Sequence, residues 1–199
     1  MSDRFADLLR HGEPLGGGRF RGGSQDPLTP KGLAQLRAAA AAAGADWDLI
    51  LTSPARRCAD FAKELARDLG LPWESWPELG ERGWGDWEGL RADQIPPADL
   101  ARFWTDPLGF APPRAEPFAA FSARVLGAWR RLLGGPARYP LLITHGGSVR
   151  VILGDVLGLP QASLILIEVP YACLTRLRLP QSPGRPSLMT HGPCPPGFA

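Results

Sequence analysis

The stretch Leu141-Leu142-Ile143-Thr144-His145-Gly146-Gly147 is the part of this 199-residue chain that decides its predicted fold. Its three aliphatic residues form the most strand-like run in the sequence, and a helix is predicted to follow over residues 148–157. A histidine directly after a fully apolar strand is either a satisfied core residue or part of a ligand site. Gly146 and Gly147 favour a ligand site, because glycine lets a bound group approach the backbone closely.

The same order of strand, polar residues and helix recurs earlier in the chain. Residues 5–9 form a strand candidate that ends at Arg10-His11-Gly12-Glu13. Residues 48–51 form another, and a helix is predicted from Ser53-Pro54 to residue 69. The remaining predicted elements are a helix over 30–43 between the N-cap Thr29 and Gly44, a helix over 118–133, and strands over 164–169 and 173–179.

This alternation of strands and helices predicts an α/β fold, a three-layer α/β/α sandwich with a mainly parallel central sheet. Ligands in such folds bind at the carboxyl ends of the strands, which is where His11 and His145 lie. One domain is expected over residues 1–180. Within it, the Trp-rich and irregular residues 71–116 are predicted to form an excursion over one edge of the sheet, near the site. Residues 181–199 are Pro-rich and are predicted to form a flexible tail.

The charges of the chain nearly balance, with 22 Lys and Arg against 20 Asp and Glu. The net charge of +2 lacks the broad positive field of a protein that binds nucleic acid, so no nucleic-acid partner is expected. Lys31 and Lys63 are the only lysines and Asn is absent, a skew typical of GC-rich coding. The excess of arginine is therefore not by itself a sign of phosphate binding.

Cysteine usage and hydropathy place the chain in a reducing compartment. Three scattered cysteines are too few for a disulfide framework, and no C-x-x-C pair suggests zinc. No apolar run approaches the roughly 18 residues needed to cross a bilayer, and no signal-peptide pattern follows Met1. We therefore expect a cytoplasmic protein without a membrane partner, and the sequence leaves open whether it forms a homodimer.

Two positively charged segments could form an anion site with the histidines. Arg10 stands beside His11 and is followed by a Gly-rich loop, although a capped strand end with a surface arginine is the plain alternative. The predicted helix after Ser53-Pro54 would direct its N–H groups, with Arg56 or Arg57, toward the strand ends, unless this arginine pair is simply solvated. Phosphate suits this set better than a metal, because a zinc site needs a third ligand at suitable spacing.

Five separated motifs together resemble the histidine phosphatase superfamily, also called phosphoglycerate-mutase-like, over about residues 4–179. The segments that carry this resemblance are Arg10-His11-Gly12-Glu13, Asp26-Pro27-Leu28-Thr29-Pro30-Lys31-Gly32, Ser53-Pro54-Ala55-Arg56-Arg57, Leu79-Gly80-Glu81 with Gly85-Asp86-Trp87-Glu88-Gly89, and Thr144-His145-Gly146-Gly147. The resemblance implies a nucleophilic His11 that becomes phosphohistidine, its other ring nitrogen being held by a backbone carbonyl near the start of the loop.

The resemblance also assigns the rest of the site. Arg10, Arg57, His145 and Gly146 match phosphate-pocket positions, and Glu81 matches the general acid that protonates the leaving group and then activates water. Glu88 is expected to orient the loop, while Glu13 and Glu78 are weaker candidates for the acid. Trp84 and Trp87 are expected to pack in the core, with a place for one of them at the pocket mouth as the alternative. No metal or cofactor is implied.

The positions at which this chain differs from the family pattern indicate the class of its substrate. Pro14 and Leu15 stand where mutase-type members have Thr or Ser and a nearby Asn, and the chain is short for a mutase, so hydrolysis is favoured. Residues 16–22 and 103–116 resemble α-ribazole-5′-phosphate phosphatases of cobalamin assembly, although Arg114-Ala115-Glu116-Pro117 replaces the usual Gly-Gly-Glu-Ser. Candidates for the pocket rim are Arg19, Arg21 and Glu116.

A small phosphorylated metabolite is therefore the expected substrate. A phosphoglycerate-mutase-type phosphotransferase and a non-catalytic protein that binds a phosphorylated ligand remain the alternatives.

Overall fold

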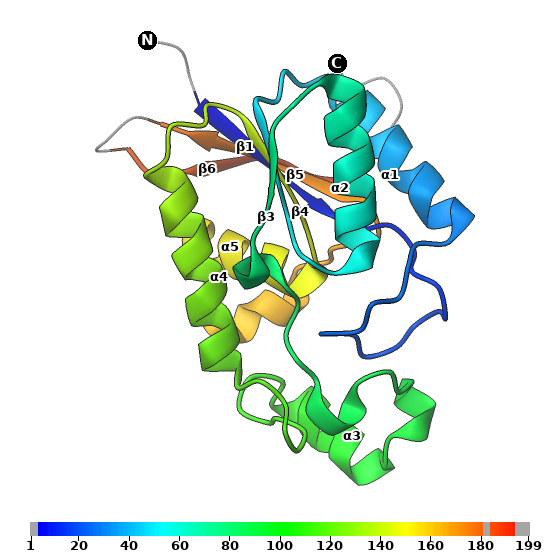
Figure 1. The fold of residues 1–199 in the computed structure, drawn as a ribbon. Helices are drawn as coiled ribbons and strands as arrows, with labels where there is room; N and C mark the ends of the chain where they lie inside the picture. Colours follow the sequence, from blue (N-terminus) through cyan, green and yellow to red (C-terminus); the bar gives the residue numbers. More distant parts are fainter. Residues whose placement is uncertain (1–3, 181–183, 194–199) are drawn as a thin grey trace.

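Two neighbouring parallel strands, β1 (Arg4–Arg10) and β4 (Pro140–Thr144), form the centre of a six-stranded sheet in the computed structural model (Figure 1). The structure describes residues 4–180 and 184–193. The other strands are β2 (Leu49–Thr52), β3 (Trp73–Ser75), β5 (Cys173–Leu179) and β6 (Ser187–Pro193). The helices are α1 (Pro30–Ala43), α2 (Arg56–Leu69), α3 (Pro97–Thr105), α4 (Phe118–Leu133) and α5 (Gly146–Leu157).

The strand order β3-β2-β4-β1-β5-β6 confirms the predicted, mainly parallel sheet. Strands β3, β2, β4 and β1 are parallel to their neighbours, whereas β5 is antiparallel to β1 and β6 is antiparallel to β5. The first four strands therefore end at the same edge of the sheet. The antiparallel β5 begins at that edge, so the loop before it also contributes to the site.

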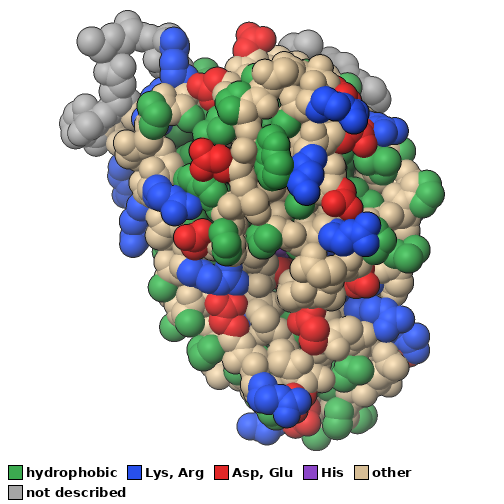
Figure 2. Space-filling view, viewed as in Figure 1, with side chains coloured by type: hydrophobic (Ala, Val, Ile, Leu, Met, Phe, Trp, Pro, Cys, Tyr) green, Lys and Arg blue, Asp and Glu red, His purple; other side chains and the backbone are tan. Residues whose placement is uncertain are grey.

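Alternating side chains of the central strands divide the core into two halves. Leu142 of β4 packs with residues of α4 and α5, whereas Leu141 and Ile143 pack with residues of α1 and α2. Figure 1 shows the two pairs of helices on opposite faces of the sheet, so the predicted three-layer α/β/α sandwich is confirmed. On the face shown in Figure 2, positive and negative side chains are interspersed and form no continuous basic surface.

Helix boundaries follow the capping signals of the sequence in most places. The Thr29 hydroxyl accepts the Gly32 N–H at 2.9 Å, Pro30 begins α1, and Gly44 ends it in the left-handed conformation. The predicted start of α2 at Ser53 is wrong, because the helix begins at Arg56. Proline disfavours helical geometry in the residue before it, and Ala55 is still extended, with a ψ of 133°.

Three further predictions need correction. Residues 164–169 are not a strand, since a 3₁₀ helix spans Gln161–Leu166, and a short apolar run cannot distinguish the two by periodicity. Residues 71–116 include the edge strand β3 and the helix α3, as well as short 3₁₀ helices. Within the predicted tail, β6 pairs with β5, while residues 181–183 and 194–199 lie outside the described residues. None of the helices in the described part of the chain has the length and hydropathy required to cross a membrane.

A buried carboxylate stabilises the strand that carries His11. Asp7 of β1 is fully buried and accepts two hydrogen bonds of 3.0 Å from Arg176 of β5, together with one of 2.9 Å from the Trp47 indole and one of 3.3 Å from the Tyr139 hydroxyl. A buried charge is tolerated when it is both paired and fully hydrogen-bonded. Asp7 thereby fastens β1 to β5 and to the segment before β2.

We expect the substitution Asp7→Ala to lower the free energy of unfolding by about 3–5 kcal/mol, because it leaves the buried donors without their acceptor. Urea denaturation followed by circular dichroism measures this. The control Asp93→Ala removes a carboxylate that pairs with Arg91 at the surface and should change the midpoint little. Equal effects of the two substitutions would contradict the importance of the Asp7 network.

Candidate active site

The parallel pairing of β1 with β4 brings the two predicted histidines together. Arg10 is in register with Thr144, and the His11 N–H continues the ladder by donating to the Thr144 carbonyl at 2.9 Å. The His11 and His145 rings then lie with their centroids 5.3 Å apart and their planes at 65°. Both side chains are buried, at 6% and 1% exposed, at the carboxyl edge of the sheet.

One nitrogen of the His11 ring is held by the backbone. His11 Nδ1 lies 2.7 Å from the Gly12 carbonyl oxygen, and because a carbonyl only accepts, Nδ1 carries the proton. Nε2 therefore keeps its lone pair, as nucleophilic attack requires. Gly12 is needed here because a Cβ at this position would lie 2.0 Å from the Gly32 carbonyl oxygen.

His145 is oriented by the hydroxyl of Ser53. Ser53 Oγ lies 2.7 Å from His145 Nε2, and it also accepts the Ala55 N–H at 3.3 Å. In the tautomer in which the hydroxyl donates to Nε2, the imidazole proton lies on Nδ1. His145 can then donate to an anion while its ring remains neutral.

The two predicted phosphate-binding arginines are both buried near these rings. Arg57 is fully buried and donates to the carbonyls of Ser24 at 2.7 Å and Gly22 at 3.1 Å, which shapes the Gly-rich loop. Arg10 donates to the Val169 carbonyl and stacks over Tyr171, 4.4 Å from the ring centroid. Arg56, by contrast, reaches the exposed Asp60 on its own helix.

Unpaired donors gather at this one place. Within the described residues, five buried side-chain nitrogen or oxygen atoms have no hydrogen-bond partner. Three of them are Arg10 Nε, Arg57 Nε and His145 Nδ1, and all three are donors in the states derived above. Buried polar groups are nearly always satisfied, so a cluster of unpaired donors indicates a site for an anion with several acceptor oxygens.

Glu81 lies at the N-terminus of α5, beside the histidines. Its Oε2 accepts the Gly147 N–H at 2.9 Å and its Oε1 accepts the Arg82 N–H at 3.0 Å. A Cβ built on the neighbouring Gly146 would lie 3.5 Å from Arg10 Nε, so Gly146 borders the same place.

The other acidic candidates are engaged elsewhere. Glu88 accepts the N–H groups of Gly22 and Ser24, which confirms its predicted role in orienting the loop. Glu13 pairs with Lys31 and Glu78 with Arg131.

The loop arginines and Glu116 bind neighbouring parts of the chain. Arg21 donates to the Asp26 carboxylate and to the carbonyls of Leu15 and Gly17, which closes the loop close to His11. Arg19 donates to the carbonyls of Gly16 and Gly89 from an exposed position. Glu116 pairs with Arg124, and its place at the pocket rim remains a prediction.

Sequence reasoning missed Tyr171, whose ring lies 5.8 Å from that of His11 and beneath Arg10. Tyr171 precedes β5, and a residue before an antiparallel strand reaches the edge where the parallel strands end. The predicted strand over residues 173–179 would have placed Tyr171 at the site if its antiparallel direction had been known.

A cavity of about 270 Å³ opens beside Glu81 and has largely aromatic and aliphatic walls. Its lining comes from the excursion, from α4 and α5, and from the 3₁₀ helix Gln161–Leu166, and includes Phe20, Glu81, Arg82, Trp84, Phe103, Trp104, Pro107, Leu108, Phe118, Phe121, Gly147, Arg150, Val151, Leu164 and Ile165. Both tryptophans pack in or against the aromatic cluster, as predicted. The buried Trp87 also borders a second hollow, and Trp84 lines this cavity. This cavity is the natural place for the group attached to a phosphate.

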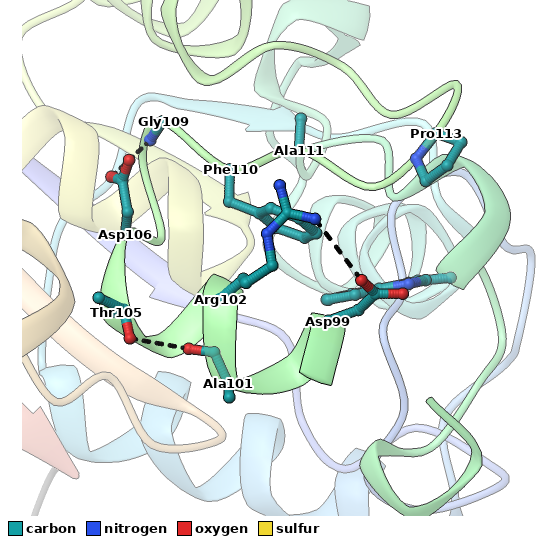
Figure 3. Close-up of a pocket in the computed structure, with 10 residues that line it drawn as sticks. Asp99, Ala101, Arg102, Thr105, Asp106, Gly109, Phe110, Ala111 and Pro113 are labelled. Carbon is teal, nitrogen blue, oxygen red and sulfur yellow. Dashed lines mark hydrogen bonds and ion pairs between the residues drawn. The ribbon is translucent and has the colours of Figure 1, made fainter. Parts of the chain in front are cut away.

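A larger hollow of about 740 Å³ lies between α3 and the segment that follows it (Figure 3). Arg102 crosses this hollow, between Phe110 and its ion-pair partner Asp99. None of the predicted site residues lines it. The size of a hollow therefore does not identify the functional pocket. The predicted site residue Glu81 does, because it lines the smaller cavity.

Both histidines are held in the neutral form. Burial lowers the pKa of His11 to about 3, and the positive charge of Arg10 adds to this effect. Burial also lowers the pKa of His145 well below its ordinary value, with further contributions from Arg57 and His11. A neutral His11 is the form that can attack phosphorus.

Residues 7–191 match the family model of the histidine phosphatase superfamily, branch 1. The chain therefore belongs to this superfamily, as its motifs predict, and it is a phosphatase.

Individual relatives span nearly the whole chain. Adenosylcobalamin/alpha-ribazole phosphatase of Escherichia coli K12 is 27% identical over 185 residues, which cover 87% of this chain and 89% of the relative. Glucosyl-3-phosphoglycerate phosphatase of Mycobacterium tuberculosis is 33% identical over 179 residues, or 82% and 79% of the two chains. The crystal structure of the alpha-ribazole phosphatase from Shigella flexneri matches with a TM-score of 0.85 at 26% identity, covering 97% of this chain and 98% of that one.

We expect the free energy of unfolding to fall as the pH is lowered from 7 to 5. The unfolded chain protonates each histidine near pH 6.5, whereas folded His11 stays neutral down to about pH 3. The stabilisation is complete above pH 6.5 and is lost at about 1.4 kcal/mol per pH unit for each such histidine. Urea unfolding at several pH values measures the slope. His11→Asn should reduce the slope, and an unchanged slope in His11→Asn would contradict the assignment.

Proposed function

We propose that this chain is a metal-independent phosphomonoesterase that hydrolyses a small phosphorylated metabolite through a phosphohistidine on His11. The observation that carries the proposal is the cluster of unpaired buried donors, Arg10 Nε, Arg57 Nε and His145 Nδ1, beside a histidine whose Nδ1 is held by a carbonyl. A phosphoryl group supplies three acceptor oxygens and a negative charge to such a cluster.

In the first step, His11 Nε2 attacks phosphorus. The bond from nitrogen to phosphorus forms as the bond from phosphorus to the ester oxygen breaks, and Glu81 gives its proton to the leaving oxygen. Arg10, Arg57 and His145 donate to the equatorial oxygens and stabilise the charge that develops there.

In the second step, water replaces the alcohol. The carboxylate of Glu81 takes a proton from water, the water oxygen bonds to phosphorus, and the bond to His11 Nε2 breaks. Inorganic phosphate leaves, and both side chains return to their starting protonation states. One carboxyl group at the cavity mouth thus serves as acid and then as base.

The walls of the cavity favour an aromatic or apolar leaving group, such as the benzimidazole nucleoside of α-ribazole 5′-phosphate. Trp84, Phe103 and Trp104 provide flat apolar surfaces there, which suit stacking on a planar ring. The second candidate is glucosyl-3-phosphoglycerate, and the presence of Arg150 in the same lining favours it, because arginine pairs with a carboxylate.

Two other functions have less support. A mutase would have to keep phosphohistidine from water, and Pro14 and Leu15 stand where mutase-type relatives place polar contacts to phosphate. A binding protein without turnover would not require both a nucleophilic nitrogen on His11 and a carboxyl group on Glu81.

His11→Ala should lower kcat/KM for p-nitrophenyl phosphate by about 10³-fold or more, because it removes the nucleophile. After a brief reaction with ³²P-labelled substrate, the label bound to the protein should survive base and be released by acid. Phosphohistidine resists base, whereas phosphoserine resists acid. His191→Ala is the matched control, since His191 lies on β6 and bonds to Thr175. Unchanged activity of the His11→Ala variant would contradict the role of His11. Inhibition by excess EDTA would contradict the metal-independent mechanism.

Turnover of α-ribazole 5′-phosphate should exceed that of glucosyl-3-phosphoglycerate, measured as kcat/KM by phosphate release. Trp104→Ala should reduce this preference by about 5- to 150-fold, because one stacking surface is worth about 1–3 kcal/mol. Trp73→Ala is the matched control, since Trp73 is an exposed tryptophan on the edge strand β3. A preference for the glucosyl compound, or equal effects of both substitutions, would argue against an aromatic leaving group.

A further inference from the structure

Arg124 of α4 uses every donor of its guanidinium group on one short segment of the chain and on Glu116. Nη1 donates to the Glu78 carbonyl at 2.9 Å and to the Gly80 carbonyl at 2.8 Å, and Nη2 donates to the Glu81 carbonyl at 2.9 Å. Nε and Nη2 donate to the two carboxylate oxygens of Glu116 at 2.7 and 2.8 Å. An arginine has five N–H donors, and all five are satisfied here.

The segment that Arg124 holds has little regular structure of its own. It begins within the 3₁₀ helix Pro77–Leu79 and leads to Gly83, so its carbonyls have no strand ladder to join. Thr144 Oγ1 donates to the Leu79 carbonyl at 2.6 Å, and Ser148 Oγ donates to that of Gly80 at 3.1 Å. The carbonyls of Glu78 and Glu81 depend on Arg124, which fixes the two ends of this turn.

The two ends of Glu81 are thus held by different helices. Its main chain is bonded to Arg124 of α4, and its carboxylate is bonded to the Gly147 N–H at the start of α5. Proton transfer requires a donor within hydrogen-bond reach of the leaving oxygen, and a displacement of about 1 Å can cost 10²-fold in rate. A shift of the Glu81 main chain would be transmitted to the carboxyl group.

We propose that Arg124, locked by Glu116, is a positioning residue for proton transfer to the leaving group, because it holds the Glu81 main chain beside the N-terminus of α5. The proposal rests on the proposed role of Glu81 as general acid. Arg124 itself contacts no substrate, and its effect acts through the place of the Glu81 carboxyl group.

Charge and shape both make arginine specific for this position. Lysine keeps the charge but has three donors at a single point, so it cannot bond to three carbonyls and a carboxylate at once. Burial raises the pKa of Glu116, but hydrogen bonds from Arg124 and the Gly83 N–H outweigh it, and the net pKa lies below its ordinary value. The ion pair therefore persists across the neutral range.

Dependence on the leaving group separates a positioning role from a purely structural one. An alkyl phosphate releases a strongly basic alkoxide that needs a proton, whereas 2,4-dinitrophenyl phosphate releases a stable phenolate that does not. The ratio kcat/KM reports the steps up to departure of the leaving group, so it excludes the later hydrolysis of phosphohistidine.

The experiment measures kcat/KM for sn-glycerol 3-phosphate and 2,4-dinitrophenyl phosphate with Arg124→Lys, Glu81→Gln and Arg4→Lys. Arg4 is the matched control, because its guanidinium group also donates to three backbone carbonyls. They belong to Leu133, Gly135 and Ala137, at the C-terminal end of α4. Arg124→Lys should lose about 10- to 100-fold on the alkyl ester and less than about 3-fold on the dinitrophenyl ester. Arg4→Lys should change the two ratios alike.

Glu81→Gln distinguishes the failure of this inference from that of the proposed function. It should lose about 10²- to 10⁴-fold on the alkyl ester alone, and uniform losses would overturn the acid role of Glu81. If Glu81→Gln shows the leaving-group dependence and Arg124→Lys shows equal losses or none, the positioning role of Arg124 is overturned. Should Arg124→Lys fail to fold, Glu116→Gln replaces it, and it must show the same selective loss in smaller degree or the inference falls.

Discussion

The parallel pairing of β1 with β4 is the interaction on which the site depends. It puts His11 and His145 side by side although 134 positions separate them, and the bond from the His11 N–H to the Thr144 carbonyl extends the ladder past the ends of both strands. A slip of one residue would turn the side chains of one strand to the other face of the sheet. The alternation of Leu141, Leu142 and Ile143 between the two halves of the core prevents that slip, so the register of the core and the geometry of the site have the same origin.

The same edge of the sheet concentrates positive charge that the protein leaves incompletely satisfied. Arg10 and Arg57 are buried with carbonyl partners, yet one nitrogen of each remains without an acceptor, as does His145 Nδ1. Leaving buried donors unpaired costs stability in the ligand-free protein, and neutral histidines limit the accumulated charge. Donors that are already in place need no reorganisation when charge develops on a phosphoryl group, and such preorganisation is the main source of electrostatic catalysis.

The phosphate side of the site could be predicted from the sequence, because its residues follow strands in known motifs. His11, His145 and Arg57 each stand directly after an apolar run or in the first turn of the helix behind it, where strand topology determines their place. Tyr171 and Arg124 could not be predicted in this way. Tyr171 depends on the direction of β5, and Arg124 depends on how α4 packs against an irregular turn, which no local periodicity encodes.

The errors in secondary structure have similar causes. Apolar residues 164–169 fit a strand or a helix equally well, and the Pro-rich composition around residues 187–193 concealed the pairing that forms β6. Composition describes a local preference, whereas pairing with an existing edge such as β5 is a tertiary effect that overrides it.

The two halves of the site come from parts of the chain that differ in structure, the regular sheet and the irregular excursion. The sheet edge supplies the nucleophile and the phosphate donors, and the irregular excursion supplies Trp84, Phe103 and Trp104 of the aromatic cavity walls. Because the excursion packs around an aromatic cluster of its own, its cavity walls can differ among relatives while the phosphate chemistry of the sheet edge is retained. Such a division works only if the excursion is tied to the sheet at the point where the chemistry occurs. Arg124 of α4, which holds the Glu81 main chain, makes that connection. Arg82 joins parts of the excursion to one another through the carbonyls of Glu116, Pro107 and Phe110.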